Sequence, residues 1–91
     1  MVIIDPSYTV HLRKIFPEIS ESKIEIFTLF VYGMTCKDIA KLKGVSPQAV
    51  SKVLREICNM YGVTNLDMLK SVYAIRLDLY THLNFSFEAY V

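Results

Sequence analysis

The sequence predicts an all-α protein, a compact bundle of four to five helices with an extended C-terminal helix. The three glycines, Gly33, Gly44 and Gly62, each follow a segment whose apolar residues recur at helical spacing. Glycine is favoured just past a helix C-terminus because it adopts positive φ without strain. Several of these segments also begin directly after a serine or threonine, the residue types that cap helix N-termini. Helices separated by sharp stops are therefore expected along most of the chain.

The length of 91 residues suits a single domain. We expect its core in residues 19–66, an N-terminal extension in residues 1–18, and a C-terminal helix and tail in residues 67–91. Hydrophobic residues make up 53% of the chain and charged residues 21%, slightly more and slightly less than in an average soluble domain. Some of the apolar surface is therefore expected to be covered by a partner.

The charge is nearly balanced overall but is unevenly placed. A formal net charge of +1 does not by itself indicate nucleic acid. Residues 19–66 hold six cations and four anions, whereas residues 67–91 hold two cations and three anions. Any basic surface is therefore expected in the middle of the chain.

Several classes of protein are disfavoured by what the sequence does not contain. The two cysteines, Cys36 and Cys58, form no CxxC pair, and the two histidines lie near opposite ends of the chain, so neither a metal site nor a disulfide framework is expected. No apolar run approaches the ~18 residues that a membrane span needs, and residues 1–5 do not resemble a signal peptide. The sequence also shows no nucleophile–base pair and no glycine-rich phosphate loop, so neither catalysis nor a cofactor is expected. The prediction is a soluble cytoplasmic protein.

The first half of the chain contains two predicted helices. The first covers residues 8–16, with Ser7 as its cap and Pro17 as its stop. Its expected inward residues are Val10, Ile15 and Phe16. The second begins after Ser20 and ends before Gly33. Its expected inward residues are Ile24, Phe27, Leu29, Phe30 and Val31.

Two further helices follow in quick succession. Residues 35–38 have the form of a capping box and open a short helix that Gly44 ends. The expected inward residues of that helix are Ile39, Ala40 and Leu42. The next helix covers residues 47–61, with Ser46 as its cap and Pro47 at its first position, where a missing N–H has no cost. Its expected inward residues are Val50, Val53, Leu54 and Ile57.

The last helix is expected to start after Thr64 or Asn65 and to carry many apolar residues. Beyond it, residues 84–91 form a tail that we expect to fray unless it is docked. The tail contains Phe85, Phe87 and Tyr90.

Residues 39–61 have the spacing of a helix-turn-helix. Ala40 is small enough for the first helix to cross the second closely, and Gly44 allows the chain to reverse in a few residues. In this motif the N-terminal part of the second helix enters the major groove of DNA. Polar side chains are therefore needed there, and Gln48 and Lys52 are among those present.

The candidate DNA contacts follow from the residue types on that helix. Gln48 is suited to paired hydrogen bonds with adenine, and Ala49 to packing on a thymine methyl group. Ser51, Lys52 and Arg55 are suited to holding phosphates or a guanine. The simpler interpretation is that these polar residues form only a solvated face.

Four stretches resemble the LuxR-type (GerE-like) helix-turn-helix domain of bacterial transcription regulators. They are residues 19–33, 34–40, 44–46 and 61–65, and the single positions Val50, Leu54 and Ile57 match as well. The most specific parts are the Gly-x-Thr-x-Lys-Asp-Ile-Ala block that starts at Gly33 and the Gly-Val-x-Asn block that starts at Gly62. Residues 19–69 align with the family pattern without an insertion or deletion.

The resemblance implies a DNA-binding domain that is usually dimeric on double-stranded DNA, with residues 47–61 as the recognition helix. The family's DNA contacts fall here on Thr35, Lys37, Gln48, Ala49, Ser51, Lys52 and Arg55. The family's dimers commonly use the last helix, which implies a homodimer through Leu69, Val72, Tyr73, Arg76, Leu77 and Tyr80. Some positions depart from the family pattern, since Lys23 replaces a glutamate, Ala49 a threonine and Ser51 a lysine.

A second interpretation is that the helix-turn-helix binds protein instead of DNA. Such a chain would be an anti-activator, a heterodimer partner of a larger transcription regulator, or a module that contacts RNA polymerase. The near-zero net charge, the missing basic positions and the aromatic tail favour this interpretation.

Overall fold

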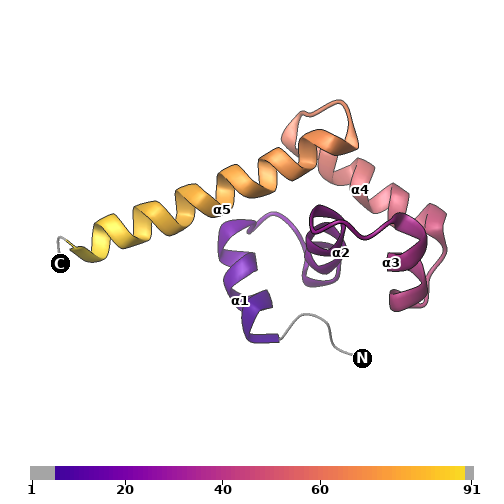
Figure 1. Cartoon of the computed structure of the whole chain (residues 1–91), viewed down its shortest axis with the longest axis horizontal. Coiled ribbons are helices and arrows are strands. Elements are labelled where there is room, and N and C mark those ends of the chain that lie inside the picture. The colour runs from indigo at the N-terminus through magenta and orange to yellow at the C-terminus, as the bar shows by residue number, and fades with distance from the viewer. Residues whose placement is uncertain (1–5, 90–91) are drawn as a thin grey trace.

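Five helices joined by short turns make up the part of the chain that a computed structural model describes, namely the backbone of residues 6–89 and the side chains of residues 7–82. The helices are α1 (Pro6–Ile15), α2 (Glu21–Val31), α3 (Cys36–Lys43), α4 (Pro47–Tyr61) and α5 (Leu66–Ala89). The predicted all-α bundle with an extended C-terminal helix is confirmed. In Figure 1 the C-terminal half of α5 projects away from the other four helices.

Helix α2 lies at the centre of the bundle and packs against each of the other four helices. Its residues from Ile24 to Leu29 are buried with the exception of Glu25, because neighbouring helices cover this part of α2 on most sides. The buried Thr28 hydroxyl lies 3.1 Å from the Tyr73 hydroxyl of α5. Each of these two polar groups therefore has a hydrogen-bond partner, as burial requires.

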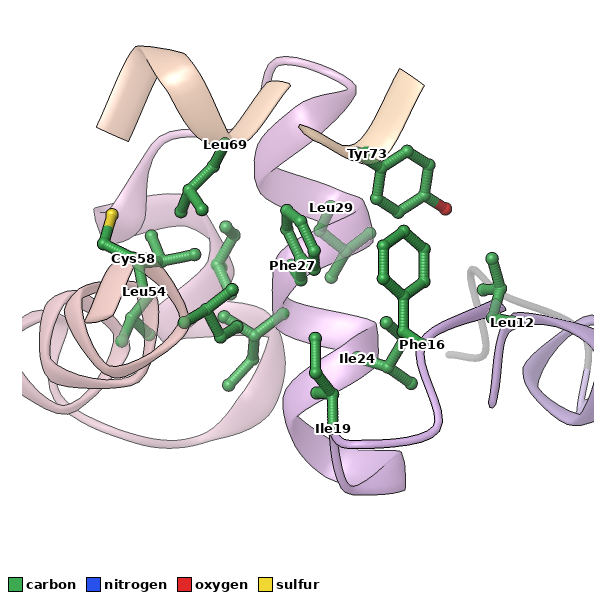
Figure 2. Packing of buried hydrophobic residues seen from close by; sticks show 14 of the residues in the cluster. Leu12, Phe16, Ile19, Ile24, Phe27, Leu29, Leu54, Cys58, Leu69 and Tyr73 are labelled. Atoms are coloured by element: carbon green, nitrogen blue, oxygen red, sulfur yellow. The ribbon is translucent and has the colours of Figure 1, made fainter. Parts of the chain in front are cut away.

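An aromatic cluster joins the two ends of the chain to α2. The ring of Phe16, which is fully buried, lies 5.4 Å from that of Phe27 and 5.2 Å from that of Tyr73. Figure 2 shows these three side chains together in the core, with Leu12 and Leu69 on either side. The core therefore extends beyond residues 19–66 in both directions, and α1 and α5 are parts of the same packed unit.

Helix α1 differs from the expectation in its start and in its inward face. It begins at Pro6, ahead of the predicted start at residue 8, and it ends at Ile15. Val10 was expected inside but is 59% exposed, whereas Thr9 and Leu12 are buried. The reason is geometric, because at about 100° per residue Val10 lies on the opposite side of the helix from Leu12.

Three of the predicted helix caps make capping hydrogen bonds, whereas Ser7, predicted to cap the first helix, lies inside α1. Thr35 and Ser46 each accept a side-chain hydrogen bond from the backbone N–H three residues later, at 3.2 and 3.1 Å. Asn65 does the same at 3.0 Å, so it is Asn65 rather than Thr64 that caps α5. Ser20 occupies the predicted N-cap position of α2, but its hydroxyl makes no capping hydrogen bond.

The C-terminal segment is helical further than expected. Helix α5 continues to Ala89, so the expectation of a frayed tail from residue 84 is wrong for the backbone up to that point. The side chains of Phe85 and Phe87, and Tyr90 as a whole, lie outside the described residues. Within residues 6–89, no helix combines the length and the apolar character that crossing a membrane requires.

Candidate nucleic-acid interface

Helices α3 and α4 form the most extensively packed pair of the bundle and are joined by three residues, Gly44–Ser46. Gly44 has φ +70°, a conformation that strains any residue with a side chain. The backbone N–H of the next residue, Val45, donates to the carbonyl oxygen of Ala40 at 3.0 Å and closes the end of α3. The geometry predicted from the spacing, two helices with a tight turn between them, is therefore present.

Helix α4 has one apolar side and one polar side. Val50, Leu54 and Ile57 are completely buried against the rest of the bundle, and Val53 is half-buried at the edge of that side. Because these residues recur every three or four positions, they hold the helix in one rotational orientation. The side chains that occupy the opposite face are consequently directed into solvent.

The polar side of α4 forms an open depression lined by Gln48, Ser51, Lys52, Arg55, Glu56 and Asn59. The structure thus brings together four of the residues predicted from the sequence to contact DNA. Ala49 is exposed nearby but does not line the depression, while Thr35 and Lys37 are exposed at the start of α3. Ser51 is the one half-buried member of the predicted set.

Two lining residues, Glu56 and Asn59, were not predicted as functional. Both could have been found by continuing the surface stripe along α4, because Asn59 follows Arg55 by four positions and Glu56 follows Lys52 by four. Residues separated by three or four positions lie side by side on a helix. The helix-turn-helix motif itself draws attention to the N-terminal part of the second helix, so the predicted residues end at Arg55.

Salt bridges neutralise two of the six cations of residues 19–66. Lys23 of α2 pairs with Glu56 of α4 at 3.0 Å, and Lys43 of α3 pairs with Glu25 of α2. The remaining four cations form no ion pair with other described residues, and all four lie on α3 and α4. They are Lys37, Lys41, Lys52 and Arg55. The available positive charge of this region is therefore concentrated on the helix-turn-helix.

The six residues predicted for dimerisation do not share an exposed face. Leu69 and Tyr73 are buried in the core of the single chain, where they cannot meet a second molecule. Val72, Leu77 and Tyr80 are half-buried.

Arg76, the sixth predicted dimerisation residue, is occupied within the chain. It donates a hydrogen bond to the carbonyl oxygen of Ile15 at 3.0 Å and pairs with Glu18 at 2.8 Å. Its guanidinium group also lies over the rings of Phe16 and Tyr61, at 5.6 and 4.8 Å. Arg76 therefore fastens α5 to the end of α1.

The contacts among Arg76, Glu18 and Tyr61 also shift the pKa values of Tyr61 and Glu18. Burial raises the pKa of Tyr61, and the nearby Glu18 carboxylate adds to the effect. For Glu18 itself, burial acts to raise the pKa, but the Tyr61 hydroxyl, its own backbone N–H and Arg76 together lower it. These shifts favour an ionised Glu18 carboxylate beside a neutral Tyr61 phenol.

A different set of apolar residues is exposed on α5. Ile75 and Leu79 are 57% and 54% exposed, and Met68 is exposed as well. Together with the half-buried Val72, they follow one another at intervals of four, three and four residues. This spacing is typical of the seam of a coiled coil. We call Met68, Val72, Ile75 and Leu79 the outer stripe of α5.

The two thiols offer no second candidate site. Cys58 is buried on α4, and burial raises the pKa of its thiol, which favours the unreactive protonated form. Among the described residues no three His, Cys, Asp or Glu side chains cluster in a way that would hold a metal ion.

Comparisons with protein-family models, with curated proteins and with solved structures found no match for this chain. The resemblance to the LuxR-type domain therefore rests on the residues quoted for it. The description of the candidate interface on α3 and α4 depends only on the positions and charges of its own residues.

Proposed function

We propose that this chain is a DNA-binding transcription regulator that places α4 in the major groove of double-stranded DNA. The observation that carries the proposal is that the four cations of residues 19–66 that form no ion pair with other described residues all lie on the two helices of the helix-turn-helix. Phosphate attraction provides most of the affinity in such complexes, and contacts to base edges provide the specificity. A regulator of this kind works in the cytoplasm.

Within this proposal the residues of α3 and α4 have separate tasks. Thr35 and Lys37 hold phosphates at the edge of the groove, because both are exposed at the first turn of α3. Gln48, Lys52 and Arg55 project from the polar side of α4 toward base edges and phosphates. Ala49, exposed beside them, contacts the methyl group of a thymine, and Ser51 supports the same surface.

We further propose that the chain acts as a homodimer, with the outer stripe of α5 as the contact between the two copies. Large apolar side chains such as Ile75 and Leu79 are costly to leave in water. Their heptad-like spacing suits a second helix of the same kind.

The second candidate function is binding to another protein through that stripe, with a larger transcription regulator or RNA polymerase as the partner. The exposure of Ile75 and Leu79 favours this candidate as much as it favours a homodimer. A protein-binding function does not, however, account for unpaired cations gathered on α3 and α4. We therefore rank DNA binding first.

Fluorescence anisotropy on random-sequence duplex DNA at two salt concentrations tests the proposal, with light scattering to measure the mass. Four phosphate contacts predict a slope of about −3.5 in log K against log salt for each DNA-bound subunit. Micromolar or tighter binding with such a slope, by a species of twice the monomer mass, is the expected result. If no duplex binds even at low salt, the function belongs to a protein partner instead.

A further inference from the structure

Glu56 is an acidic residue in a surface that is otherwise suited to a polyanion. It lines the depression on α4 together with Lys52 and Arg55. Its Oε2 atom accepts a hydrogen bond from the Nζ atom of Lys23, which reaches across from α2, at 3.0 Å. The Lys23 and Glu56 side chains are 43% and 42% exposed, so both are accessible to solvent, and Glu56 lies at the depression itself.

The pair sets the charge at this point of the surface. A carboxylate that faces DNA is repelled by the phosphates, and this repulsion opposes binding to every sequence alike. A lysine in contact with it cancels that charge. Because both groups are well exposed, the pair contributes little to folding stability, and removing one partner mainly changes the local charge by one unit.

We propose that Glu56 limits the DNA affinity of this surface, because its carboxylate pairs with Lys23 and so withholds one cation from the phosphates. This inference rests on the DNA-binding function proposed above. Phosphate contacts carry no sequence information, so the Lys23–Glu56 pair lowers the affinity for a preferred site and for competing DNA by about the same factor.

Three substitutions test the charge logic. Glu56→Gln leaves Lys23 free and adds one unit of positive charge, Lys23→Met leaves Glu56 free and adds one negative charge, and the double variant restores a net charge of zero. Each additional phosphate contact raises the salt slope by about 0.9. Binding to random duplex at ~0.1 M salt is therefore expected to tighten about three- to tenfold in Glu56→Gln and to weaken comparably in Lys23→Met. The double variant is expected to bind like the wild type.

The chain provides a matched control in its second salt bridge between α2 and the helix-turn-helix. Glu25→Gln frees Lys43 and changes the net charge of the protein by the same amount as Glu56→Gln. Glu25 and Lys43 line a separate depression with Ser20, Glu21 and Ser22. Glu25→Gln is therefore expected to change DNA affinity less than twofold. Helicity measured by circular dichroism checks that every variant is folded.

The experiment is anisotropy titration of each full-length variant against two probes. One is random duplex, and the other is a duplex enriched by the wild-type protein from a randomised pool. In Glu56→Gln both affinities are expected to rise about three- to tenfold with their ratio unchanged, since the phosphates of the two duplexes are alike. If Glu56→Gln and Glu25→Gln tighten binding equally, or neither does, Glu56 does not limit DNA affinity. If the wild type binds no duplex at all, the DNA-binding function itself fails, which is a different result.

Discussion

Helices α4 and α5 lie next to each other in the chain but differ in how their surfaces are divided. On α4 every fully buried residue lies on one side and the opposite side is polar, with Lys52 and Arg55 at its centre. On α5 one apolar side packs into the core through Leu69 and Tyr73, while a second apolar stripe faces solvent.

This difference suits the two helices to contact surfaces of different character. The polar side of α4 can be hydrated when free and can meet another polar, charged surface such as DNA when bound. The outer stripe of α5 gains free energy only when another apolar surface covers it. The two proposed functions, DNA binding and self-association, thus fall on adjacent helices.

The largest expected effect separates the two apolar sides of α5. Leu69→Ala removes a fully buried side chain and is expected to lower the free energy of unfolding by about 2–5 kcal/mol. Leu79→Ala, which removes the same atoms from a residue that is 54% exposed, is expected to cost the isolated chain about 0.5 kcal/mol or less. Urea denaturation of dilute protein measures both. Similar losses in the two variants would contradict the division of α5 into an inner and an outer side.

The polar side of α4 is tested by substituting Gln48 and Lys52 with alanine together. Removing each side chain's interaction with DNA is expected to cost about 1–3 kcal/mol, so affinity for an enriched duplex falls about a hundredfold while the circular dichroism spectrum is unchanged. The control is Lys14→Ala, which removes an exposed cation from α1. Unchanged DNA affinity in the double variant would remove α4 from the binding surface.

The outer stripe of α5 is tested by the double variant Ile75→Glu with Leu79→Glu. Two carboxylates placed in the seam are expected to dissociate the dimer, because burying an unpaired charge is far more costly than the apolar contact it replaces. Light scattering and sedimentation at micromolar concentration report the mass. A dimer that survives these changes would place the contact between subunits elsewhere.

The smallest expected effect is a loss of folding stability at alkaline pH, caused by the ionisation of Tyr61 and Tyr73. Burial raises the pKa of Tyr61 and of Tyr73 in the folded chain. A raised folded pKa means that stability is fully present below the unfolded value of about 10 and declines as the pH rises above it. Thermal unfolding between pH 8 and 11 is expected to show a falling midpoint, and Tyr61→Phe is expected to reduce the fall. The same pH dependence in that variant would show that Tyr61 has no part in it.

Local features of the chain were predictable because they depend on neighbouring residues. The bounds of α4, its cap at Ser46 and its stop at Gly62 follow from hydrogen bonds and backbone preferences within a few positions. The side chains of Gln48 and Lys52 were placed on the solvent side by periodicity alone. The error at Val10 has the opposite origin, since a short helix with few apolar residues is oriented by what it packs against.

The amino-acid sequence alone specifies the all-α class, the helix-turn-helix and the residues of its polar side, because helical periodicity, caps and glycine stops act over short distances. Packing between helices selects which side of α5 is buried, since that helix is apolar on two sides and either could have faced the core. Tertiary packing also paired Lys23 with Glu56, which lie 33 positions apart in the chain. Such contacts depend on how separate helices are oriented about α2, and no local pattern records that orientation.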